Sequence, residues 1–188
     1  MIMTLKFAFV AGCLVLAGLT YFRCHCRRDW AWLVVGLGFT VGADYFLVLH
    51  NEHLAGVAVF CFVHVCYILR RIGDSVKKAV AAFAVVGVLV AVAFFNGSVI
   101  MLGAVYASLF VANIVINLKT RLPKLNWALT LAGLVLFALC DINVLLFNLP
   151  RYFDVAHGIS NVVFPLIWVF YLPSQLLLAI SALDFKRG

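Results

Sequence analysis

Long apolar runs, separated by short polar connections, make up almost the whole chain. Each run approaches the roughly 20 mostly apolar residues that a helix needs to cross a bilayer. The runs fall at residues 3–22, 30–49, 54–70, 78–95, 98–117, 126–148 and 160–183. Little sequence is left for a soluble domain. We therefore predict an all-α fold in which residues 1–188 form one seven-helix transmembrane bundle.

The composition agrees with a membrane protein. The chain is 66% hydrophobic and 11% charged, with a mean hydropathy of +1.16, whereas soluble domains are about 45–50% apolar and roughly 25% charged. The hydropathy pattern predicts an integral, multi-pass protein whose partner is the lipid bilayer. The short loops lead us to place it in a bacterial inner membrane.

The net charge of +7 does not point to nucleic acid, because its placement between the runs explains it. Most of the 14 Lys and Arg residues lie in alternate connections or at the C-terminus: Arg23, Arg27, Arg28, Arg70, Arg71, Lys77, Lys78, Lys119, Arg121, Lys124, Lys186 and Arg187. The positive-inside rule puts these segments in the cytoplasm. With seven helices, we expect a cytoplasmic C-terminus and an outer N-terminus.

Two of the predicted helices carry an acid inside the apolar run. The same helical face, at a spacing of four residues, holds Gly36, Thr40 and Asp44 in one run and Gly133, Phe137 and Asp141 in the other. A carboxylate at membrane depth costs several kcal/mol unless it is paired, solvated or protonated. Asp44 and Asp141 are predicted at similar depth on parallel helices. They are therefore candidates for a two-carboxylate site.

Other polar residues fall on stripes that could face these acids. The candidates for supporting or substrate-binding roles are Lys6, Thr40, His64, Tyr67, Tyr106, Asn143, Tyr171 and Gln175. His64 could instead bond a neighbouring helix, and Lys6 could be an interfacial lysine whose ammonium reaches the headgroups. Asn113 and Asn117 are read as contacts between helices. These alternatives stay open from the residues alone.

Two carboxylates in a low-dielectric site cannot easily both be ionised, so one is expected to hold a proton. An acid and a base result, which suits hydrolysis through an oxocarbenium-like state, as in two-carboxylate glycosidases. The sequence has no Gly-x-Ser-x-Gly or His-Glu-x-x-His motif. His64 alone is too little for a zinc site. We expect neither a metal nor a cofactor.

The pattern resembles the YhhN-type lysoplasmalogenase-like membrane proteins. Their Gly-x-x-x-Phe-x-x-x-His-x-x-Tyr, Gly-x-x-x-Phe-x-x-Ser-Asp and Tyr-x-x-x-Gln motifs are met here by Gly56, Phe60, His64 and Tyr67, by Gly133, Phe137 and Asp141, and by Tyr171 and Gln175. Cys140 replaces the serine of the second motif. Phe7 follows Lys6 where the family has proline, and the glycine before Asp44 is displaced by one position.

The resemblance implies hydrolysis of the vinyl ether bond of a lysoplasmalogen, giving a fatty aldehyde and a glycerophospho-headgroup. Asp44 and Asp141 would be the general acid and base, in an order that is left open. Four candidates would orient water or hold the acids: His64, Tyr106, Tyr171 and Gln175. Lys6 or Arg151 would meet the phosphate of the lysophospholipid substrate.

Two other functions use the same buried acids. A proton- or cation-coupled carrier, or a seven-helix receptor without catalysis, fits the repetition of the second and sixth helices. An intramembrane aspartyl protease also needs two membrane aspartates. It fits less well, because the chain has neither a Pro-Ala-Leu segment nor a clean Gly-x-Gly-Asp motif.

Overall fold

The computed structural model describes residues 2–72, 75–120, 122–148 and 160–185. These residues form helices α1 (Ile2–Leu19), α2 (Arg27–Asp44), α3 (His53–Ile72), α4 (Val76–Phe95), α5 (Val99–Lys119), α6 (Lys124–Asn148) and α7 (Ser160–Ile180). All seven helical stretches are long and apolar enough to cross a membrane, so the predicted all-α bundle is confirmed. Helix α7 ends before residue 183, and α3 continues past residue 70. Arg121, Arg151, Lys186 and Arg187 lie outside the described residues.

Two short non-α segments extend the first two helices. A 3₁₀ turn over Thr20–Arg23 follows α1, and a π-helical turn over Tyr45–Leu49 follows α2 directly after Asp44. Sequence periodicity did not predict the π turn. Such turns are rare and often lie at functional sites.

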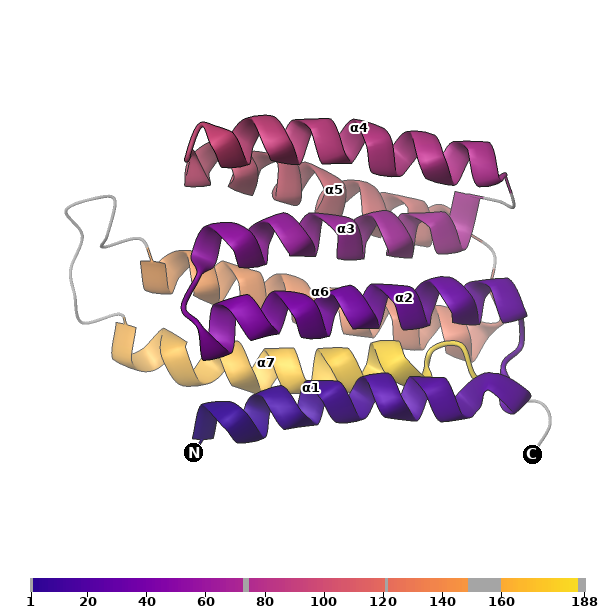
Figure 1. Cartoon of the computed structure of the whole chain (residues 1–188). Coiled ribbons are helices and arrows are strands. Elements are labelled where there is room, and N and C mark those ends of the chain that lie inside the picture. The colour runs from indigo at the N-terminus through magenta and orange to yellow at the C-terminus, as the bar shows by residue number, and fades with distance from the viewer. Residues whose placement is uncertain (1, 73–74, 121, 149–159, 186–188) are drawn as a thin grey trace.

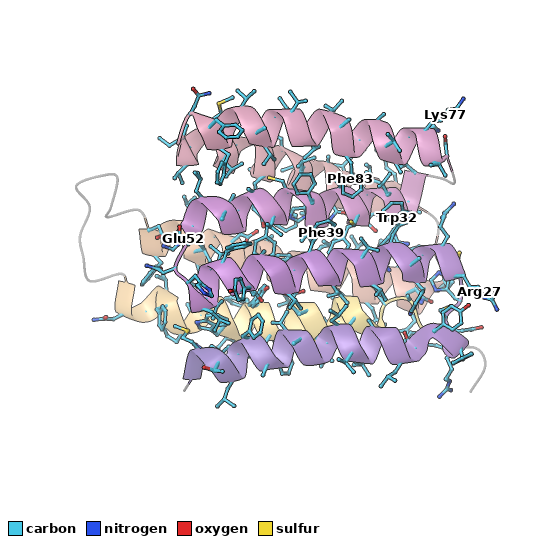
Figure 2. The ribbon with its side chains drawn as sticks, in the orientation of Figure 1. Arg27, Trp32, Phe39, Glu52, Lys77 and Phe83 are labelled. Atoms are coloured by element: carbon cyan, nitrogen blue, oxygen red, sulfur yellow. The ribbon has the colours of Figure 1, made fainter. Side chains whose placement is uncertain are left out.

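Consecutive helices are antiparallel and pack side by side, and α1 also packs against α7 (Figure 1). Because α3 also packs directly against α5, helix α4 lies on the outside of the bundle. Figure 2 labels Arg27 and Lys77 at one end and Glu52 at the other. We call the end with Arg27 and Lys77 the basic end and the other the opposite end. The orientation of these ends in the membrane stays a prediction.

An aromatic stack joins α2 and α3 to α4. Phe83 of α4 lies 5.8 Å from Phe62, 6.2 Å from Trp32 and 6.2 Å from Phe39, measured between ring centroids. Trp32, Phe39 and Phe83 lie close together in Figure 2. Trp32 therefore packs within the bundle.

Glycines allow two pairs of helices to approach closely. A Cβ at Gly36 of α2 would lie 2.7 Å from the Tyr67 ring of α3, and one at Gly133 of α6 would lie 2.8 Å from Leu178 of α7. Both neighbouring side chains are buried, so they have little room to move away. Small residues at these crossings are typical of membrane helices.

Alanine at Gly36 or Gly133 is expected to lower stability by about 1–3 kcal/mol, the usual cost of overpacking. Gly38 is the matched control on α2, because a Cβ there would meet nothing within 4 Å and alanine favours helix. Thermal unfolding in detergent measures the effect. Equal midpoints for Gly36→Ala and Gly38→Ala would contradict the close packing.

Candidate functional site

Asp44 ends α2 and is 3% exposed. Tyr171 of α7 reaches it across the bundle, and its hydroxyl lies 2.8 Å from both carboxylate oxygens. Within the described residues, no lysine, arginine or histidine forms an ion pair with Asp44. The Tyr171 hydroxyl is therefore the side-chain donor that the structure shows for Asp44. An ionised carboxylate inside a membrane helix needs such a partner.

Asp141 has an equivalent partner on a different helix. It lies on α6, half-buried, and the Tyr106 hydroxyl of α5 donates to its Oδ2 at 2.5 Å. Hydrogen bonds to charged acceptors are shorter and stronger than those between neutral groups. Tyr106 and Tyr171 therefore each contact one of the two carboxyl groups.

An aromatic cluster links the two tyrosine–aspartate pairs. Phe137, one turn before Asp141, lies 5.7 Å from the Tyr171 ring and 5.8 Å from the His64 ring. His64 in turn lies 4.9 Å from the Tyr106 ring. No hydrogen bond joins the two carboxylates in the part of the chain that the structure describes. The acids therefore belong to one buried region, and each is held separately within it.

Three of the predicted supporting residues each have a buried polar atom that makes no hydrogen bond within the described part of the chain. These atoms are His64 Nε2, Tyr67 Oη and Gln175 Oε1, considered against the described residues alone. Tyr67 lies beside Thr40, and Gln175 Nε2 donates to the Ser174 hydroxyl at 3.3 Å. An unsatisfied buried polar group costs about 1–3 kcal/mol. Each of these atoms therefore needs a partner, such as a bound water or a bound ligand.

Other predicted site residues are engaged elsewhere. The Thr40 hydroxyl donates to the Gly36 carbonyl at 3.1 Å, and the Asn143 amide donates to the Leu139 carbonyl at 2.7 Å. Both side chains therefore bond their own helix one turn back, and neither is recorded as bonding an acid. Lys6 of α1 places its ammonium 4.0 Å from the centroid of the Trp168 ring of α7, a cation–π contact.

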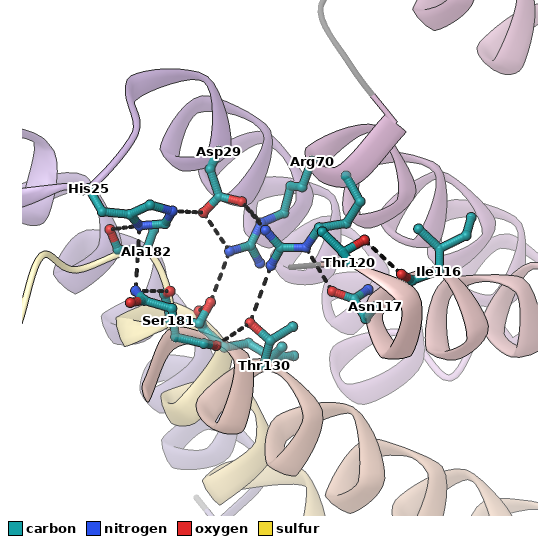
Figure 3. A network of polar contacts seen from close by, with 12 residues as sticks. His25, Asp29, Arg70, Ile116, Asn117, Thr120, Thr130, Ser181 and Ala182 are labelled. Carbon is teal, nitrogen blue, oxygen red and sulfur yellow. Dashed lines mark hydrogen bonds and ion pairs between the residues drawn. The ribbon is translucent and has the colours of Figure 1, made fainter. Parts of the chain in front are cut away.

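The sequence interpretation missed a buried charge cluster at the basic end (Figure 3). Arg70 binds both carboxylate oxygens of Asp29, at 3.0 and 2.9 Å, and Arg71 binds Oδ1 at 2.5 Å. These three side chains are at most 3% exposed. The expectation that both arginines lie in the connection after the third run was wrong, because α3 extends to Ile72 and Asp29 neutralises part of their charge inside the bundle.

Removing one tyrosine hydroxyl tests its bond to the neighbouring acid. Tyr106→Phe and Tyr171→Phe are each expected to lower the stability of the protein by about 1–3 kcal/mol, because each variant leaves a carboxyl group in the bundle without its hydrogen-bond donor. Tyr45→Phe, at a tyrosine that is 45% exposed, is the control. Thermal unfolding in detergent measures the loss, and unchanged midpoints in both core variants would contradict these two hydrogen bonds.

Comparison with known proteins gives one family. No curated protein and no solved structure matches the chain. The model of the YhhN family matches residues 3–182, which is nearly the whole sequence and includes both aspartates and their tyrosine partners. The chain belongs to the YhhN family.

Proposed function

We propose that this protein is a membrane hydrolase that cleaves the vinyl ether bond of a lysoplasmalogen. The observation that carries the proposal is the pair of carboxyl groups, Asp44 and Asp141, each hydrogen-bonded to a tyrosine in one buried aromatic region. Membership of the YhhN family supports it. The substrate is a lysophospholipid, which reaches a membrane site from the bilayer.

The reaction needs one acid and one base. The protonated aspartate gives its proton to the second vinyl carbon, which turns R–CH=CH–O–R′ into the oxocarbenium ion R–CH₂–CH=O⁺–R′. The other aspartate takes a proton from water as the water oxygen bonds to the oxocarbenium carbon. The aspartate that took a proton from water gives it to the O–R′ oxygen as the hemiacetal breaks its bond to that oxygen. The first aspartate, now ionised, takes the hydroxyl proton of the hemiacetal, so both carboxyl groups return to their starting states. The products are the aldehyde R–CH₂–CHO and the alcohol HO–R′.

The burial of the site favours this chemistry. Charge develops on the substrate when the vinyl carbon is protonated, and a nearby carboxylate stabilises positive charge far better in a low-dielectric interior than in water. The tyrosine hydroxyls orient the two carboxyl groups. His64, Tyr67 and Gln175 offer polar atoms for water or for the ether oxygen.

The phosphate of the substrate would lie toward the interface at the opposite end. Lys6 is half-buried near the start of α1, and its ammonium lies over the Trp168 ring. An anionic headgroup can pair with an ammonium that is held in this way. Thr40 and Asn143 lie on the two helices that carry the acids. Each donates a hydrogen bond to a backbone carbonyl of its own helix.

Three lysolipids that share one chain length and one headgroup test the proposal. The first carries a 1-alkenyl ether, the second a saturated 1-alkyl ether and the third a 1-acyl ester. Protein purified in detergent is incubated with each, and mass spectrometry identifies the products. We expect a fatty aldehyde from the alkenyl ether and no cleavage of the alkyl ether, which cannot be protonated at carbon. Ester cleavage alone, or no product from a folded protein, would overturn the proposal.

A further inference from the structure

A continuous chain of side-chain hydrogen bonds connects the charge cluster at the basic end to His64. Arg71 Nε donates to Asn117 Oδ1 at 2.7 Å, and Asn117 Nδ2 donates to Asn113 Oδ1 at 2.8 Å. Asn113 Nδ2 then lies 3.3 Å from His64 Nδ1. Figure 3 shows the first of these contacts, at Asn117. Asn113, Asn117 and His64 are all buried.

An arginine at the start of this chain fixes the direction of every bond in it. A guanidinium has only donors, so the Asn117 atom that faces Arg71 must be the amide oxygen. The other Asn117 atom is then the NH₂ group, which requires the oxygen of Asn113 opposite to it. Asn113 is left with its own NH₂ group facing His64.

The same logic assigns the tautomer of His64. Its Nδ1 faces an amide donor and must accept, so this nitrogen carries no proton. A neutral imidazole with an unprotonated Nδ1 has its proton on Nε2. A second proton on Nδ1 would face the Asn113 amide hydrogen directly. The chain therefore favours a neutral ring whose Nε2–H is a donor.

The ring that carries this donor packs among residues of the candidate site. His64 is 0% exposed, and its ring packs 4.9 Å from Tyr106, 4.6 Å from Phe110 and 5.8 Å from Phe137. Nε2 has no hydrogen-bond partner among the residues that the structure describes. Tyr106 is the residue that binds Asp141.

We infer that Asn113 is a positioning residue, which holds His64 in the Nε2–H tautomer so that this N–H donates to an oxygen of bound water or bound lipid. The catalytic benefit rests on the proposed hydrolase function, whereas the tautomer does not. His64 then acts as a neutral donor and not as the general base. That leaves proton transfer to the aspartates.

Nitrogen-15 NMR of protein labelled on histidine tests the tautomer in detergent without substrate. The chain has five histidines, and the signals that vanish in His64→Gln assign the ring. We expect the Nε2–H form in the wild type. In Asn113→Asp the carboxylate accepts a hydrogen bond, so the ring proton is expected to move to Nδ1. Asn148→Asp, whose amide bonds only the Val144 carbonyl in the described structure, should leave the tautomer unchanged.

Turnover of the alkenyl lysolipid tests the role of the donor. Asn113→Asp is expected to lower kcat about 10²- to 10³-fold, as when a donor to the reacting oxygen is lost, with KM nearly unchanged. His64→Gln can still place an amide N–H near the Nε2 position and should lose about tenfold, whereas His64→Leu should lose as much as Asn113→Asp. An Nδ1–H tautomer in the wild type, or unchanged turnover in a flipped Asn113→Asp protein, would overturn the inference. Failure of the hydrolase proposal would leave the tautomer result standing.

Discussion

Asparagine in place of either Asp44 or Asp141 is expected to lower the proposed hydrolysis of a lysoplasmalogen about 10²- to 10⁴-fold, the usual contribution of a general acid or base. The amide has nearly the same shape and still accepts a hydrogen bond from Tyr171 or Tyr106. It can neither deliver a proton to the vinyl carbon nor take one from water. The loss should therefore appear in kcat while the fold is kept.

The control for this pair is Glu52→Gln, which removes an exposed carboxylate from the opposite end of the bundle. Size-exclusion profiles and thermal midpoints show whether each variant is folded. Full turnover in Asp44→Asn or Asp141→Asn would remove that acid from the mechanism. An equal loss of turnover in Glu52→Gln would mean that the effect comes from removing any carboxylate and is not specific to the two aspartates.

Alanine in place of Asp29 is expected to destabilise the protein by about 3–5 kcal/mol, because it leaves Arg70 and Arg71 buried without their common counter-ion. The two guanidinium groups would then repel each other in a place that water scarcely reaches. Helices α2 and α3 would lose the ion pairs that join them at the basic end. Thermal unfolding in detergent measures the loss.

Two comparisons make the stability prediction specific. Lys124→Gln, at an exposed residue of the same end, should melt as the wild type does. A triple variant with Asp29→Leu, Arg70→Met and Arg71→Met should recover most of the lost stability, since apolar replacement of a whole buried ion cluster is often neutral. A wild-type melting temperature in Asp29→Ala would contradict a structural role for the cluster.

The fold could be predicted from the sequence because the length and apolarity of each run determine whether it can cross a bilayer. The ends of some helices were predicted less well, since α3 extends past residue 70 and α7 ends before residue 183. Arg70 and Arg71 were assigned to a connection between helices, because hydropathy counts charges without regard to their partners. Their burial depends on Asp29, which pairs with them only once α2 and α3 pack together.

The candidate site was predicted as a set of residues and only partly as a geometry. Spacing correctly placed His64 and Tyr67 on a buried face of α3. It could not assign one tyrosine to each acid, because Tyr106 and Tyr171 lie on helices whose rotation is set by packing. Asn143 shows a second limit of spacing, since asparagine can bond its own helix one turn back.

Hydrolysis of the alkenyl lysolipid in D₂O tests the central claim most directly. The aldehyde is reduced at once to an alcohol, so that later exchange of its α-hydrogens with D₂O adds no deuterium. The masses of both products are then measured by mass spectrometry. Protonation at the vinyl carbon predicts one deuterium on the carbon next to the former aldehyde carbon, with none of this product from Asp44→Asn or Asp141→Asn. No aldehyde from the folded wild type, or an aldehyde without deuterium, would contradict carbon protonation by a buried aspartate.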